Sequence, residues 1–282
     1  MSEKINLKVE NLSASYKTKR SAGRKTDMHE KIINDMSFIA KSGELVCICG
    51  PNGCGKSTLL SVLAGVPGAA LKVTGRVLME SGDGIAKGGS PDSPVEISHM
   101  KVGERAKLIA YMQQTELSVW DFNVFDYVLQ GRFAHSGGGH YTNCDKKIVR
   151  DVLEELGLAA FAARTLHTLS GGEFQKIRIA RAFSQQPRFM LLDEPAASLD
   201  YVYEPHLMGL LRDAARSKNI GIIVSVHDIN LARAFADKIM LLSPEKAAIF
   251  GSPDDIMNVE NLRITFGVDF TCQKTECFQS LQ

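Results

Sequence analysis

The feature that most limits the fold of this 282-residue chain is a glycine-rich stretch enclosed by two apolar runs. The stretch reads Gly50-Pro51-Asn52-Gly53-Cys54-Gly55-Lys56-Ser57-Thr58. Leu45 to Cys49, before it, is apolar at every position, which is typical of a parallel strand covered on both faces. An apolar helical run begins at Leu59. Because a strand, a glycine turn and a helix start in this order direct backbone N–H groups at an anion, the sequence predicts a phosphate-binding loop.

The loop and a second strand end supply the residues expected to carry chemistry. We expect Lys56 to reach the β- and γ-phosphates of a nucleotide and the Ser57 hydroxyl to bind Mg²⁺. The apolar run Phe189 to Leu192 is followed directly by Asp193 and Glu194. Adjacent carboxylates at a strand end are costly unless a cation lies nearby. We therefore predict that Asp193 holds Mg²⁺ through water and that Glu194 is the general base, with a plain surface turn as the alternative.

The remaining patterns predict an α/β fold around a mainly parallel sheet with helices on each side. The run Ile220 to Val226 is a further buried strand, and residues 148–156 follow a helical period that stops at Gly157. Near the amino terminus, Ile5 to Val9 alternates like a half-buried strand, which predicts an antiparallel portion. Lys238 to Leu242 and Ala247 to Phe250 read as the two strands of a hairpin.

Composition excludes several classes of protein. The chain has 33 basic and 32 acidic side chains, a formal charge of +1, so no chain-wide basic surface for nucleic acid is expected. No apolar run approaches the roughly 18 to 20 residues of a membrane span, and the first residues lack the apolar core of a signal peptide. The 6 cysteines are scattered along the chain, which is typical of reduced thiols. These features predict a cytoplasmic protein.

A second candidate anion site lies at Leu169-Ser170-Gly171-Gly172-Glu173. Ser170 with Glu173 three positions later forms the pattern of a capping box, and the glycines leave the start of the following helix open to close approach. An ordinary helix start is one interpretation. The other is a second phosphate-binding segment that faces the nucleotide from the side opposite the phosphate loop.

These motifs, in this order, resemble those of the ATP-binding cassette (ABC) ATPases along nearly the whole chain. The matching segments are the phosphate loop at 50–58, the Leu-Ser-Gly-Gly-Glu signature at 169–173, Leu-Leu-Asp-Glu-Pro at 191–195, Ser198-Leu199-Asp200 and His227. The resemblance implies ATP as substrate with Mg²⁺, and a head-to-tail homodimer with two composite sites. Each site would combine one subunit's residues 50–58 with the other's signature. It further implies that Ser170, Gly171, Gly172, Glu173 and Asp200 act across the dimer.

The resemblance also gives roles to three isolated residues. Gln114 matches the glutamine that senses Mg²⁺ and the attacking water and joins the core to a helical subdomain. His227 matches the switch histidine at the γ-phosphate, with a buried core histidine as the alternative. Tyr16 matches the aromatic residue that stacks on adenine, although it could equally be a half-buried strand residue.

Two further segments resemble a subgroup, the ATPases of iron-siderophore, haem and cobalamin importers. They are residues 123–135, although Ala134 replaces a proline there, and residues 227–232. The family usually has arginine where Lys176 stands and a hydroxyl residue at Ala196. This resemblance implies an ATPase peripheral to the cytoplasmic face of the membrane, partnered by integral permease subunits and indirectly by a substrate-binding protein. A soluble ATPase of iron-sulfur cluster assembly and an exporter ATPase are the alternatives. A chromosome-organising ATPase is disfavoured because no long heptad segment interrupts the motifs.

We predict one ABC ATPase domain over residues 1–282, with a nucleotide-binding core at 1–114 and 169–250, a helical subdomain at 115–168 and a carboxy-terminal extension at 251–282. Segments 17–31 and 81–107 read as long loops whose role the sequence leaves open, contact of the first with anionic lipid being one alternative. His135, His140, Cys144 and Asp145 could be drawn as a metal site, although no pair of them has an established ligand spacing. Cys272 and Cys277 could bind metal or form a redox pair, with inert thiols as the simpler interpretation.

Overall fold

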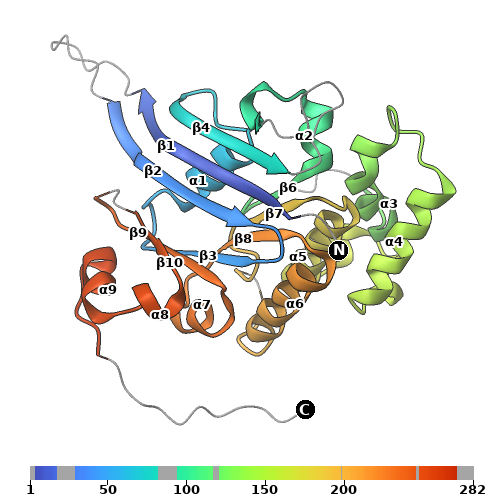
Figure 1. Cartoon of the computed structure of the whole chain (residues 1–282). Coiled ribbons are helices and arrows are strands. Elements are labelled where there is room, and N and C mark those ends of the chain that lie inside the picture. The colour runs from blue at the N-terminus through green and yellow to red at the C-terminus, as the bar shows by residue number, and fades with distance from the viewer. Residues whose placement is uncertain are drawn as a thin grey trace, which may run out of the picture.

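The computed structural model describes residues 4–17, 29–81, 94–116, 121–197, 199–245 and 248–271, which form two sheets and the helices around them (Figure 1). The larger sheet has 6 strands in the order β10-β9-β3-β8-β7-β6. The bounds of its strands are β3 Leu45–Cys49, β6 Ile109–Met112, β7 Phe189–Leu192, β8 Gly221–Ser225, β9 Lys238–Leu242 and β10 Ala248–Gly251. Every pairing in it is parallel except that of β9 with β10. The predictions of a mainly parallel sheet and a terminal hairpin are therefore confirmed.

The smaller sheet is antiparallel and confirms the predicted amino-terminal β portion. It contains β1 (Ile5–Lys17), β2 (His29–Lys41), β4 (Leu71–Ser81) and β5 (Val95–Glu96), in the order β2-β1-β4-β5. The alternation seen at Ile5 to Val9 belongs to a strand that continues to Lys17, with irregular register beyond Val9. Of the predicted loops at 17–31 and 81–107, residues 18–28 and 82–93 lie outside the described part of the chain, whereas 97–99 and 102–108 are helical.

The helices are α1 (Lys56–Leu63), α2 (Val102–Leu108), α3 (Val124–Leu129), α4 (Asn143–Glu155), α5 (Gly171–Ser184), α6 (Tyr203–Lys218), α7 (Ile229–Phe235), α8 (Pro253–Ile256) and α9 (Val259–Phe266). Short 3₁₀ turns occupy Ile97–His99, Gln130–His135, Ala159–Phe161 and Leu166–Thr168. In Figure 1, α3 and α4 lie at one end of the molecule, and α8 and α9 at the other. Helix α4 ends before Gly157, whose φ of +67° suits glycine, as the sequence predicted. None of the helices in the described residues has the length and hydropathy of a membrane span.

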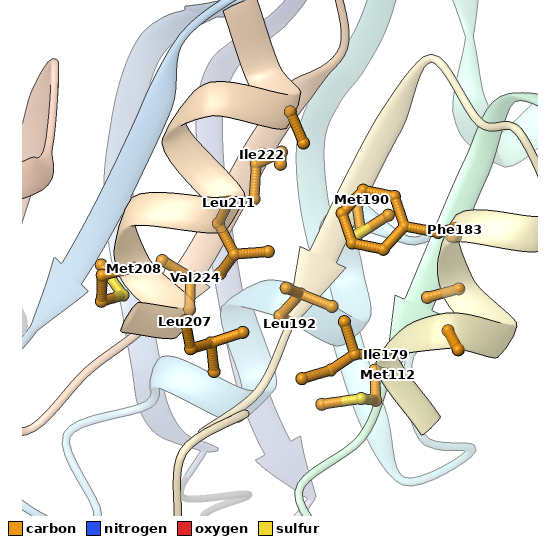
Figure 2. Close-up of a cluster of buried hydrophobic side chains, with 14 of the residues drawn as sticks. Met112, Ile179, Phe183, Met190, Leu192, Leu207, Met208, Leu211, Ile222 and Val224 are labelled. Atoms are coloured by element: carbon orange, nitrogen blue, oxygen red, sulfur yellow. The ribbon is translucent and has the colours of Figure 1, made fainter. Parts of the chain in front are cut away.

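The core lies on both faces of the larger sheet. On one face, alternate side chains of the strands pack against α5, α6 and α7. Figure 2 shows part of this cluster, where Met190 and Leu192 of β7 lie between side chains of α5 and α6. On the other face, α1 and the antiparallel sheet cover the strands, with Leu7 and Val9 of β1 fully buried. The expectation of helices on each side is met on this face by α1, which shares the cover with apolar residues that alternate along β1.

The helices between β6 and β7 are held together by a buried ion pair. Arg132 Nε lies 3.0 Å from Asp145 Oδ1, and both side chains are 7% exposed. Hydrogen bonds from Thr142, with the guanidinium of Arg132, lower the pKa of Asp145 to about 2. Arg132 also donates to the carbonyl of Ser184 at 3.0 Å, which ties it to the end of α5. Helix α5, which follows the predicted boundary at 168, packs against α3 and α4, which precede it. The packing therefore does not separate the two sides, and the subdomain limits stay a prediction.

The alternative metal site at residues 135–145 is wrong. Among the described residues, no group of three or more His, Cys, Asp and Glu side chains could hold a metal ion. Asp145 is committed to Arg132 and Thr142, and His135 Nε2 lies 3.0 Å from the carbonyl oxygen of Gln185. Cys47, Cys49, Cys54 and Cys144 are free thiols, as expected of reduced cysteines. Cys272 and Cys277 lie outside the described residues.

Candidate nucleotide-binding site

A cavity of about 340 Å³ lies where the loops that follow β3, β6, β7 and β8 meet the ends of β1 and β2. Because the carboxyl ends of parallel strands share one edge of a sheet, segments far apart in sequence converge there. Its lining residues are Tyr16, Ile32, Asn52, Gly53, Gly55, Lys56, Ser57, Thr58, Gln114, Glu194 and His227. The fold thus brings together the predicted phosphate loop, glutamine, general base and histidine.

The phosphate loop has the backbone geometry that its glycines suggest. Gly53 and Gly55 have φ angles of +79° and +110°, which L residues rarely adopt. A Cβ at Gly55 would also lie 2.7 Å from Cγ2 of Ile32. Gly55 caps α1 without a side-chain hydrogen bond, and the first turn of α1 contains no acidic residue. The N–H groups at this helix start are therefore suited to an anion.

The ammonium of Lys56 lies over the loop. Lys56 is 5% exposed, and its Nζ donates to the carbonyls of Gly50 at 2.8 Å and Pro51 at 3.2 Å. Cys54 is buried next to it, and burial raises the pKa of its thiol. The thiol is therefore neutral near pH 7, and Lys56 provides the positive charge of the loop.

Asp193 and Glu194 are fixed by one hydroxyl. Ser225, at the end of β8, is 1% exposed and donates to Asp193 Oδ1 at 2.8 Å. The hydroxyl oxygen of Ser225 also accepts a hydrogen bond from the backbone N–H of Glu194, at 2.8 Å. Glu194 has a φ of +48°, in the left-handed region that is strained for a non-glycine residue. The hydroxyl of Ser225 therefore holds the buried carboxylate and the strained backbone in one arrangement.

The carboxylate of Glu194 is held on both oxygens. Gln114 Nε2 donates to Oε2 at 2.6 Å, and His227 Nε2 lies 2.8 Å from Oε1. The side chain of Glu194 is 11% exposed, whereas that of His227 is 51% exposed and lines the cavity. The alternative interpretation of His227 as a buried core histidine is therefore wrong.

The oxygen atoms at this edge fit a divalent cation. The predicted Mg²⁺ ligands offer a hydroxyl from Ser57, a carboxylate from Asp193 and an amide oxygen from Gln114, all hard oxygen donors. Ser57 and Gln114 line the cavity, whereas Asp193 is buried and lies outside the lining, next to Glu194, which belongs to it. Because Gln114 uses its nitrogen toward Glu194, its amide oxygen is the atom left for a cation.

The signature segment is well formed but does not line this cavity. Ser170 Oγ accepts from the N–H of Glu173 at 3.2 Å, and Glu173 Oε2 accepts from the N–H of Ser170 at 2.7 Å. Hydrogen bonds with Ser170 lower the pKa of Glu173 most, and a hydrogen bond from Arg164 at 3.1 Å lowers it further. The predicted capping box is therefore confirmed. Asp200, which is exposed and caps the backbone at Tyr203, also lies outside the lining.

The position of Tyr16 is compatible with both interpretations, a half-buried strand residue and an aromatic residue that stacks on adenine. It lies in β1, paired with Glu30 and Leu71, and is 40% exposed. It also lines the cavity, so a planar base could stack on it.

Three polar residues around the site were not predicted. Besides Ser225, they are Gln175 and Arg178 of α5. Gln175 Nε2 donates to the carbonyl of Glu194 at 3.3 Å, and Arg178 Nη1 donates to the carbonyl of Gln114 at 3.2 Å. The sequence did carry a signal: Arg178 stands between Ile177 and Ile179, and Ser225 ends an apolar strand. A polar residue within an apolar run is a candidate for a buried partner.

Comparison with known proteins agrees with this geometry. The sequence profile of the ABC transporter family matches residues 33–197, over half of the chain. The chain belongs to the ABC transporter family. As a member that carries the ATP-binding domain, it is an ATPase.

Two relatives in this family align with most of this chain. The hemin import ATP-binding protein HmuV of Gloeobacter violaceus is 34% identical over 244 residues, which are 84% of this chain and 82% of the relative. An uncharacterized ABC transporter ATP-binding protein of Methanocaldococcus jannaschii is 34% identical over 264 residues, 93% of this chain and 92% of the relative.

Solved structures of ABC proteins share the fold. The structure of a metal-chelate type ABC transporter in an inward-facing conformation has a TM-score of 0.73 and 27% identity, covering 95% of this chain and 90% of that chain. A dimeric bacterial ABC transporter cassette has a TM-score of 0.68 and 23% identity, covering 88% and 98%. The predicted fold class is confirmed.

Proposed function

We propose that the cavity is the ATP site of a transporter ATPase and that its residues have the roles expected from the sequence. The phosphate loop, residues 50–58, binds the triphosphate, and Tyr16 stacks on adenine. Ser57, Asp193 and Gln114 hold Mg²⁺, which when bound neutralises phosphate charge and orients the γ-phosphate. The observation that carries this proposal is the placement of Lys56, Gln114, Glu194 and His227 around one cavity.

Hydrolysis in this arrangement depends on Glu194. Water attacks the γ-phosphorus, the bond to ADP breaks, and the carboxylate of Glu194 accepts the proton that the water loses. Gln114 and His227 hold the two carboxylate oxygens and so fix their direction. Lys56 stabilises the charge on the transferred phosphoryl group.

We further propose that the chain acts as a homodimer with composite sites. Ser170, Gly171, Gly172 and Glu173 of one subunit, with Asp200, would contact nucleotide held by the other. This proposal is supported by the position of the signature: it starts α5 with an open helix N-terminus, yet it does not line the cavity of its own chain.

Complementation between two variants tests the composite site. Lys56→Ala removes the phosphate contact, and Ser170→Arg blocks the signature. Each variant alone should be nearly inactive, whereas a mixture should recover activity because half of the sites in mixed dimers combine an intact loop with an intact signature. A mixture that stays inactive, although mixed dimers are isolated through two affinity tags, contradicts the proposal.

The partner that we propose is an integral permease, docked beside the site. A hollow of about 420 Å³ lies between the edge strand β6 and α5, and Gln130, Gly131 and Phe133 form part of its wall. Phe133 is 61% exposed. The hollow adjoins the strand that leads to Gln114, so a cytoplasmic helix of the permease seated there would follow movements of the ATP site. The ATPase would then be peripheral to the cytoplasmic face of the membrane.

For the transported compound, we propose a metal chelate taken up by an importer, with hemin, iron siderophores and cobalamin as the class. Support comes from the relative named for hemin import, from the metal-chelate type structure and from residues 123–135 and 227–232. An ATPase of iron-sulfur cluster assembly and an exporter ATPase are the competing functions, and neither draws support from these relatives.

Reconstitution separates these functions. The genes beside that of this chain are searched for a permease and a binding protein, and the chain is co-expressed with those found, purified from membranes and placed in proteoliposomes. ATP-dependent hemin uptake that requires the binding protein is the expected result. Uptake of cobalamin or a ferric siderophore instead would show that the transported compound is another metal chelate of the proposed class. ATP-driven export, or purification with cluster-assembly proteins and no permease, would overturn the importer function.

A further inference from the structure

Arg178 is a buried cation on the helix that follows the signature. Its side chain is 3% exposed. The guanidinium donates to the carbonyl of Gln113, to the carbonyl of Gln114 at 3.2 Å and to Oε1 of Gln175 at 2.7 Å. Its Nε lies 3.5 Å from Oε2 of Glu116. Arg178 therefore contacts three residues of segment 113–116, and Arg181, also of α5, holds Glu116 with hydrogen bonds of 2.6 and 2.7 Å.

Two further hydrogen bonds extend these contacts to Glu194. Gln175, which Arg178 fixes, donates to the main-chain carbonyl of Glu194 at 3.3 Å. Gln114, whose own carbonyl accepts from Arg178, donates through Nε2 to the carboxylate of Glu194 at 2.6 Å. The guanidinium thus reaches both the backbone and the side chain of Glu194 through one intermediate residue each.

Stability of the fold alone does not account for this placement. Burying a guanidinium costs desolvation that an apolar side chain avoids, and Ile177 and Ile179 on either side of Arg178 are apolar and buried. The chain also fixes α5 with a second buried arginine, Arg132, which binds the carbonyl of Ser184 at the far end of the helix. Of these two arginines, Arg178 is the one whose contacts lead to Glu194.

We propose that Arg178 is a positioning residue for ATP hydrolysis, which fixes segment 113–116 to α5 and so sets the reach of Gln114 to the carboxylate of Glu194. The inference rests on the proposed roles of Gln114 and Glu194 and deepens them. Because Arg178 lies about two turns of helix from Ser170, a shift of the signature helix is passed directly to these residues of the same subunit. In a composite dimer, the engagement of one site would then adjust the other.

Steady-state kinetics of the full chain give the first test. Arg178→Met keeps the volume and removes the donors. We therefore expect kcat to fall to about one tenth of the wild-type value or below, with KM for ATP nearly unchanged. Arg178→Lys should recover part of the loss, since an ammonium can donate to one carbonyl but not span all three acceptors. Arg132→Met is the matched control: it removes a buried arginine that binds the end of α5 from the turn 130–135, and it should lower the melting temperature while kcat stays close to wild type.

Mixed dimers give the second test, because they separate positioning from damage to α5. One subunit carries Glu194→Gln, so turnover comes from the other subunit's site. Arg178→Met in the active subunit should lower turnover, whereas in the Glu194→Gln subunit it should not. Equal losses in both placements, or an Arg178→Met enzyme that behaves like Arg132→Met, overturn the inference. Wild-type turnover by the uniform Glu194→Gln enzyme would instead overturn the proposed function.

Discussion

The backbone N–H of Glu194 donates a 2.8 Å hydrogen bond to the hydroxyl of Ser225, on the neighbouring strand. The same hydroxyl donates to Asp193, so one proton and one oxygen serve both acidic residues. Since Glu194 is strained at a φ of +48°, the contact holds a conformation that the backbone alone would not favour. The position of the proposed general base therefore depends on a residue of another strand.

Ser225→Ala should lower kcat for ATP by about 10- to 100-fold, because a buried N–H and a carboxylate oxygen each lose a partner, worth about 1–3 kcal/mol per group. Ser225→Thr, which keeps the hydroxyl, should retain most of the activity. Ser184→Ala is the control, since Ser184 is also fully buried but binds the carbonyl of Val128. Steady-state kinetics at matched folded fraction are the measurement. Equal kcat in Ser225→Ala and Ser184→Ala would contradict the assignment.

Glu194→Gln should bind ATP and hydrolyse it at least about 100-fold more slowly, because the amide cannot accept a proton from water. The amide oxygen can still accept the hydrogen bond from Gln114, so binding should be retained. Turnover and equilibrium binding of a fluorescent ATP analogue measure the two effects separately. We also expect ATP to trap this variant as a dimer in size-exclusion chromatography. Turnover near that of wild type would show that Glu194 is not the base.

Gly55→Ala should abolish ATP binding, since an added Cβ would lie 2.7 Å from Cγ2 of Ile32 at a φ of +110°. Gly53→Ala is the matched control: its φ is also positive, at +79°, but no atom lies within 4 Å of the added Cβ. It should pay only the backbone cost of about 1–2 kcal/mol. Isothermal titration with ATP compares them. If Ile32→Ala in the Gly55→Ala background restores no binding, the clash with the Ile32 side chain is not the cause, which leaves the strain at Gly55 and the Ile32 carbonyl, 3.2 Å from the added Cβ.

Much of the site was predictable because its residues follow directly from local sequence. The phosphate loop stands between a buried strand and a helix, and Asp193 and Glu194 directly follow another strand, so the rule that parallel strands present their carboxyl ends at one edge places them together. Ser170 and Glu173 specify their capping box within four consecutive positions. In each case the relevant contacts are made by near neighbours or by the shared direction of strands.

What the sequence left open depends on contacts between distant segments. The apolar run Leu45 to Cys49 predicts burial on both faces, but apolar burial is equally favourable beneath a helix or a sheet, so the run does not show that β1 shares the cover with α1. The hydrogen bonds of Ser225 and Arg178 join strands and helices far apart in the chain. A serine or arginine within an apolar run predicts that a hydrogen-bond partner exists, but the sequence does not identify that partner.

The ion pair between Arg132 and Asp145 makes stability depend on acid pH. In the fold the pKa of Asp145 is about 2, below its ordinary value of 3.8. The depressed pKa means that the native state favours the carboxylate, so the stabilisation is complete above about pH 4 and is lost as the pH falls toward 2. Asp145→Asn should therefore lower the free energy of unfolding at pH 7 by about 3 kcal/mol, because it leaves a buried guanidinium without its counter-charge.

Urea denaturation of both proteins between pH 7 and pH 2 measures this difference, which should shrink steadily below pH 4. Asp151→Asn on the same helix is the control. Asp151 pairs with Lys147 at 2.6 Å, but its side chain is 54% exposed, so its removal should cost about 0.5 kcal/mol or less. A loss at Asp145→Asn that stays constant down to pH 2 would show that packing, rather than the charge of the carboxylate, stabilises the helices between β6 and β7.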